Sequence, residues 1–146
     1  MYVSISSRLL GVVVTIFILI LTIKSELLSS WLITAQLILS IPFLMGEMLS
    51  RVKITDIENV KKYHPLNKFF QAIAFGFVFN TIGLLISKYV SFLAGIIYFI
   101  AFIIVLLLFI FVNFRNTSPF ERMMEILMIA IMIILGFLPA IGVISF

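Results

Sequence analysis

Four polar side chains lie in or beside long apolar stretches of this sequence: Gln36, Glu47, Arg51 and Asn80. Glu47 has the clearest chemical potential, because a carboxylate inside a membrane is costly and could carry protons or bind a cation. Arg51 follows Glu47 at the i+4 spacing, at which two side chains meet on one face of a helix. An ion pair at the membrane interface is therefore the competing interpretation of Glu47, and it is the one we favour.

The stretch that contains Gln36 and Glu47 also contains Ser40 and Pro42. A proline inside a helix removes one backbone hydrogen bond and clashes with the carbonyl of the residue four positions earlier, so we expect a kink. Kinked helices with polar neighbours line cavities in transporters, but they also serve to pack helices together. A side-chain hydrogen bond between membrane helices is worth about 0.6 kcal/mol. For Gln36, Asn80 and Thr81 we therefore favour packing over ligand binding.

The other residue types exclude most catalytic chemistry. The chain has no cysteine and one histidine, His64, so it lacks the means for disulfides, thiolate catalysis and iron–sulfur or cysteine-based zinc sites. No glycine-rich phosphate loop is present, and a single imidazole makes a nucleophilic triad a poor interpretation. We expect no cofactor, no metal and no enzymatic activity. The enzyme class that stays open acts on lipid through Glu121, Glu125 or Glu47 with nearby basic residues, and a charged cluster in a groove would favour it.

Composition fixes the environment of these residues. Of the 146 residues, 64% are hydrophobic and 11% are charged, and the mean hydropathy is +1.33. A soluble domain carries about 25% charged residues. The apolar stretches are long enough to cross a bilayer as helices, the form in which backbone groups bond internally. We predict one all-α transmembrane domain, 1–146, with five spans at about 2–23, 27–49, 69–86, 90–114 and 126–146.

The first of these stretches has the charge and length of a signal peptide. The small-x-small pattern that precedes a cleavage site is poor around residues 24–30, so we interpret the stretch as the first span. The joints at 24–26 and 87–89 are so short that the spans on either side of each must be antiparallel neighbours. Two antiparallel hairpins plus a fifth helix is the simplest layout.

The basic residues are distributed unevenly about these spans. Lys24 and Lys88 lie in the two short joints, whereas the other eight of the ten lie near the N-terminus and in the loops at 50–68 and 115–125. Lysine and arginine concentrate in cytoplasmic loops, which predicts a cytoplasmic N-terminus and a C-terminus outside. The net charge of +4 therefore belongs to membrane-flanking loops, and we expect no nucleic acid partner. A prokaryotic plasma membrane is the simplest match to a compact chain without a targeting sequence.

Both cytoplasmic loops contain a helix-start motif. Thr55 and Glu58 have the spacing of a capping box, which predicts a short amphipathic helix at about 55–64 that lies on the membrane surface and ends at Pro65. Lys61 and Lys62 would attract anionic lipid head groups at about 1 kcal/mol each, unless the segment is only a solvated linker. A second capping box joins Ser118 to Glu121 with proline between them, so the fifth helix should start in the loop.

Three functions from different classes remain open. We favour a non-catalytic subunit or assembly factor of a larger membrane complex, whose partners are the lipid bilayer and other membrane subunits or further copies of the chain. The helix at 90–114 is apolar on all sides, as expected of a helix that faces lipid or another subunit. The alternative is a small oligomeric transporter or channel that uses Glu47 and the kinked second helix. The lipid-directed enzyme is the third possibility.

Overall fold

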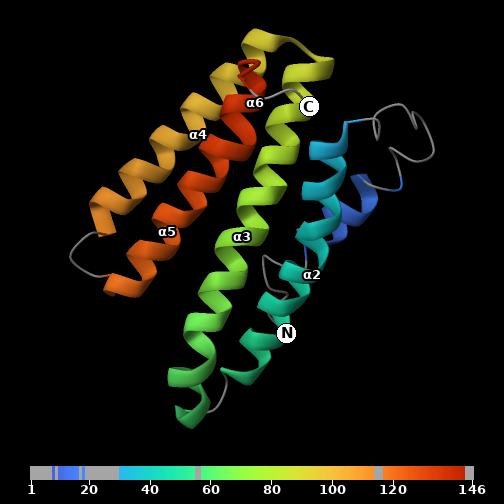
Figure 1. The fold of residues 1–146 in the computed structure, drawn as a ribbon. Helices are drawn as coiled ribbons and strands as arrows, with labels where there is room; N and C mark the ends of the chain where they lie inside the picture. The colour runs from blue at the N-terminus through green and yellow to red at the C-terminus, as the bar shows by residue number, and fades with distance from the viewer. Residues whose placement is uncertain are drawn as a thin grey trace.

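A computed structural model describes residues 8, 10–16, 18, 30–54, 57–113 and 117–143, of which 57–59 are described by their backbone alone. Every regular element in these ranges is a helix, which confirms the all-α fold. The long ones are α2 (Trp31–Lys53), α3 (Ile57–Tyr89) and α4 (Phe92–Asn113). The last rod combines α5 (Pro119–Met132), the π-helix η2 (Ile133–Phe137) and α6 (Leu138–Ala140), and it lies beside α3 and α4 (Figure 1).

Four helices in the described part of the chain are long and apolar enough to cross a membrane: α2, α3, α4 and the rod from Pro119 to Ala140. The chain is therefore an integral membrane protein, and the last four predicted spans each fall on one of these helices. The first predicted span, 2–23, lies mostly outside the described residues. Its residues 10–16 are helical, and Val13 is buried against Leu37 and Leu44. The first span, and with it the count of five, remains a prediction, as does the orientation across the membrane.

Consecutive helices alternate in direction. Phe43 of α2 meets Phe70 of α3, and Phe79 of α3 meets Phe102 of α4 with ring centroids 4.4 Å apart. Only Val90 and Ser91 join α3 to α4, which is the short connection expected of an antiparallel pair, but the predicted joint at 87–89 belongs to the last turn of α3. The rod that begins with α5 runs parallel to α3 (Figure 1). Helix α3 contacts α2, α4 and this rod.

The short surface helix predicted at 55–64 is not a separate element. Residues 57–64 form the first turns of α3, which continues through Pro65, and the prediction that Pro65 ends the helix is wrong. The proline leaves the carbonyl of Lys61 without its intrahelical donor, but Lys61 is exposed and water can replace that donor. Contacts beyond the proline to α2 and α5 hold the helix in line. The capping box of Thr55 and Glu58 lies outside the described residues.

The start of α5 follows the predicted motif. The Ser118 hydroxyl accepts a hydrogen bond from the Glu121 N–H at 3.2 Å, and a Glu121 carboxylate oxygen accepts one from the Ser118 N–H at 3.0 Å. Pro119 stands at the first position of the helix, where its missing N–H removes no intrahelical bond. The capping box is confirmed, and it fixes Glu121 and Glu125 in the first turns of α5.

Three glycines let the helices of the second half approach closely. A Cβ at Gly83 would meet the ring of Phe99, and one at Gly95 would meet Ser87. A Cβ at Gly136, in the π-helix, would meet the Asn80 side-chain oxygen. These contacts hold α4 against α3 along its first half and hold η2 against α3.

Candidate functional site

The polar residues of α2 face the interior of the bundle. Glu47 is fully buried, and one of its oxygens, Oε1, lies 2.6 Å from Nη2 of Arg51 and accepts a hydrogen bond from its Nε at 2.9 Å. The backbone carbonyl of Glu47 accepts a hydrogen bond of 2.8 Å from the Asn67 amide of α3. The favoured i+4 ion pair is therefore present. The second oxygen, Oε2, accepts no hydrogen bond from the residues that the structure describes.

Two buried amides join α2 and α3 to the last rod. The Gln36 amide donates a hydrogen bond of 2.9 Å to the carbonyl of Leu135, and the Asn80 amide donates one of 3.1 Å to the carbonyl of Ile131. In an α-helix the N–H four residues later would take the Leu135 carbonyl, but that residue is Pro139, which has none. Gln36 thus supplies from α2 the donor that proline removes.

The polar residues for which we favoured packing differ in their hydrogen bonds. Gln36 and Asn80 each use their amide N–H on a neighbouring helix, and the Thr81 hydroxyl donates to the Phe77 carbonyl of its own helix. The sequence alone could not pair Gln36 and Asn80 with their acceptors, because a backbone carbonyl of another helix carries no side-chain signal.

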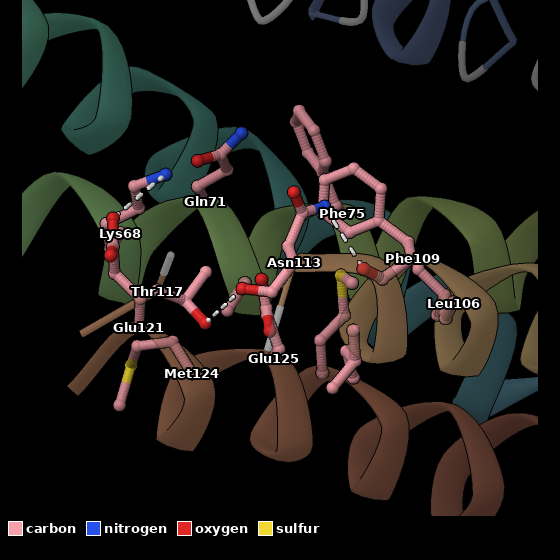
Figure 2. A pocket seen from close by; sticks show the side chains of 13 residues that line it. Lys68, Gln71, Phe75, Leu106, Phe109, Asn113, Thr117, Glu121, Met124 and Glu125 are labelled. Atoms are coloured by element: carbon pink, nitrogen blue, oxygen red, sulfur yellow. Dashed lines mark hydrogen bonds and ion pairs between the residues drawn. The ribbon is translucent and has the colours of Figure 1, made fainter. Parts of the chain in front are cut away.

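A cavity of about 410 Å³ lies elsewhere, between α3, α4 and α5. Figure 2 shows polar side chains toward one end of it, namely Lys68, Gln71, Asn113, Thr117, Glu121 and Glu125. Its apolar lining includes Phe75, Leu106, Phe109, Ile110 and Met128. None of the four predicted site residues, Gln36, Glu47, Arg51 and Asn80, lines it. The predicted candidates and the cavity are therefore two separate places in the fold.

The polar end of the cavity is charged. Oε1 of Glu121 lies 3.2 Å from His64 Nε2 and 3.7 Å from Lys68 Nζ, so side chains of α3 and α5 meet there. One turn later, Oε2 of Glu125 is buried and accepts no hydrogen bond within the described ranges. This is a cluster of acidic and basic residues in a groove, the arrangement we named as favouring action on a lipid. The capping box placed both glutamates, and the predicted topology put them on the same side of the membrane as Lys68. The sequence did not predict the contact between α3 and α5 that brings Lys68 to Glu121.

Two polar side chains of the lining, Thr117 and Asn113, already take part in local hydrogen bonds. The Thr117 hydroxyl donates to the Asn113 carbonyl at 3.2 Å, and the Asn113 side-chain amide donates to the Phe109 carbonyl at 3.1 Å. In the described part of the chain, no group of three or more histidine, aspartate or glutamate side chains is placed to hold a metal ion. The arrangement is suited to holding an amphipathic molecule at the end of the bundle.

No protein-family model matches the chain, and neither a search of curated proteins nor one of solved structures found a match.

Proposed function

We propose that this integral membrane protein is a non-catalytic subunit or assembly factor of a larger membrane complex. The observation that supports this most directly is the exposure of α4. Only 11% of its apolar window is buried within the chain, against 44% for α3. Its second half presents large apolar side chains to the outside: Ile104, Val105, Leu107, Leu108, Phe111 and Val112.

The remaining helices already hold one another through polar contacts. Gln36, Asn67 and Asn80 each donate a hydrogen bond to a neighbouring helix. α4 contributes the Tyr98 hydroxyl, which donates to the Phe79 carbonyl at 3.2 Å, and its buried residues are Gly95 and Phe99. A helix that adds so little to its own bundle has its outer surface free for another membrane protein.

Photo-crosslinking in the native membrane tests this proposal. A photoreactive side chain is placed at Leu108 of α4 and, as the control, at Leu39 of α2, which are 59% and 45% exposed. We expect a discrete protein adduct from position 108 and a weaker one, or none, from position 39. Two differently tagged copies then separate a further copy of the chain from a different subunit. Lipid adducts alone at both positions, with a purified particle of monomeric mass, would refute the proposal.

The proposal includes the surroundings of the complex. We place the chain in a prokaryotic plasma membrane with the start of α3 on the cytoplasmic side, because basic residues concentrate there. Lys61 and Lys62 are exposed on the first turns of α3, where they would meet anionic head groups. Accessibility of single cysteines at positions 62 and 88 to a membrane-impermeant thiol reagent tests the orientation, since the two should label from opposite sides.

Transport is the second candidate, and the burial of Glu47 favours it. A fully buried carboxylate, one of whose oxygens accepts no hydrogen bond from the described residues, is the group expected of a proton or cation carrier. Reconstituted into vesicles, the chain would then conduct protons or a monovalent cation, and Glu47→Gln would abolish the flux. Ser50→Ala is the control, because the Ser50 hydroxyl donates only to the Gly46 carbonyl of its own helix. A flux that Glu47→Gln leaves unchanged, or no flux in any vesicle, rejects this function.

A further inference from the structure

We propose that the cavity between α3, α4 and α5 binds a membrane phospholipid whose head group carries a primary amine. The acidic end would hold the ammonium group, Lys68 the phosphate and the apolar end the beginning of an acyl chain. This inference concerns a ligand of the single chain, so it does not depend on whether the chain belongs to a complex.

The shape and lining of the cavity favour an amphiphile. Its volume of about 410 Å³ lies within the range of small-molecule sites, roughly 300–1,000 Å³. Charged and amide groups gather at one end, and the rings of Phe75 and Phe109 lie toward the other (Figure 2). A water-soluble metabolite would leave the apolar end without a partner, and a hydrocarbon would offer no hydrogen-bond donor to Oε2 of Glu125. A phospholipid satisfies both ends.

Glu125 has a carboxylate oxygen that the described residues leave without a hydrogen-bond donor. Glu121 already has partners, since Ser118 donates to Oε2 and both His64 and Lys68 lie against Oε1. Oε2 of Glu125 is buried in the same lining and accepts no hydrogen bond from any residue that the structure describes. A buried carboxylate oxygen without a donor is unfavourable, and an ammonium group brings three N–H donors and a positive charge.

Lys68 would recognise the phosphate of the head group. Its Nζ is 3.7 Å from Glu121, too far for a short hydrogen bond, and its side chain is partly exposed. It can therefore pair with a phosphate as a point charge while Gln71, also in the lining, adds an amide. A head group with phosphate and ammonium side by side matches Lys68 and Glu125. A trimethylated amine has no N–H for Glu125, and an anionic head group without an amine leaves Glu125 unpaired.

The direct test measures bound lipid on the purified full-length chain. The chain is exchanged into micelles that contain equal amounts of dioleoyl phosphatidylethanolamine, phosphatidylcholine and phosphatidylglycerol, and native mass spectrometry counts the adducts. We expect one retained phosphatidylethanolamine per chain, with a preference of about tenfold over the other two, the size of one charge-assisted hydrogen bond. Equal retention of all three lipids, or a preference for phosphatidylglycerol, would overturn the proposal.

Variants assign the selectivity to residues. Glu125→Gln should remove the preference for the primary amine, whereas Glu125→Asp should retain it. Lys68→Gln should lower retention of all three lipids. Lys88→Gln is the matched control, because this exposed lysine in the last turn of the same helix does not line the cavity, and it should change nothing. An unchanged preference in Glu125→Gln would place the selectivity elsewhere and refute the assignment.

A further variant tests the apolar end without altering charge. Ile110→Trp fills the lining from α4 and should abolish retention of phosphatidylethanolamine while the chain keeps its elution volume and helical circular dichroism. If Glu125→Gln does not fold, Glu125→Asp and Ile110→Trp decide the matter. Full retention of lipid in Ile110→Trp would show that the lipid binds outside this cavity.

Discussion

From the hydrogen bond between Gln36 and the Leu135 carbonyl we predict that the stability lost in Gln36→Leu depends on whether residue 139 is proline. Leu135 lacks its helical donor because Pro139 has no N–H, and the Gln36 amide donates to it at 2.9 Å instead. Gln36→Leu keeps the approximate size of the side chain and removes that donor. In a Pro139→Ala background an N–H becomes available four residues after Leu135, so the carbonyl no longer needs Gln36.

The size of the effect follows from two losses that act in the same direction. An interhelical hydrogen bond in a membrane is worth about 0.6 kcal/mol on average and about 1.7 kcal/mol at most. Leaving the buried carbonyl without a partner raises the loss toward the 1–3 kcal/mol of an unsatisfied group. We expect Gln36→Leu to lower the free energy of unfolding by about 1.5 kcal/mol alone and by about 0.5 kcal/mol with Pro139→Ala. The coupling energy is then about 1 kcal/mol.

Reversible unfolding in mixed micelles, titrated with a denaturing detergent and followed by circular dichroism, measures the four free energies of this cycle. Ser40→Ala is the control on the same face of α2, because the Ser40 hydroxyl donates to the Leu37 carbonyl of its own helix. It should cost less than about 0.5 kcal/mol in either background. An equal cost of Gln36→Leu with and without Pro139→Ala would refute the argument that Gln36 replaces the missing donor.

Three further predictions use the same unfolding assay. Arg51→Gln should destabilise the chain by about 2 kcal/mol more than Glu47→Gln, because the first leaves a buried carboxylate unpaired and the second leaves an arginine that is 47% exposed; the reverse order would contradict the burial of Glu47. Gly136→Ala should cost about 2 kcal/mol, since its Cβ would meet side chains of α3 and α4, whereas Gly11→Ala, with nothing near its Cβ, should cost nothing or stabilise; similar values for both would be inconsistent with the close approach. Ser118→Ala should cost about 1 kcal/mol through loss of the helix cap, and Ser118→Asp should restore most of it; no loss in Ser118→Ala would show that the cap is energetically silent.

The sequence predicted the elements whose signals are local. Apolar stretches of sufficient length mark the spans, and the Ser118 capping box marks the start of α5 to the residue, because both depend on near neighbours in the chain. Pro65 shows the limit of such reasoning. Its local effect is to end a helix, but contacts of Asn67 with α2 and of Lys68 with α5 hold α3 continuous, and these depend on tertiary packing.

The candidate site was predicted less well than the spans, for the same reason. Glu47 and Arg51 were paired correctly, since they stand one turn apart on one helix. The sequence did not predict the cavity, although it had singled out Glu121 and Glu125. The lining comes from three helices, and only the packed structure shows how they align.

The position of the cavity follows from the difference in packing between the first and the second half of α4. Gly95 and Phe99, both buried, fix its first half against α3, where glycines allow close backbone approach. The cavity begins at Leu106, in the second half of α4, where most of the large apolar side chains are exposed. Charges of α3 and α5 then close the open end through Lys68 and Glu121. A bundle held tightly at one end by small residues and at the other by charges leaves room between them, and in a membrane the molecule at hand to fill such room is a lipid.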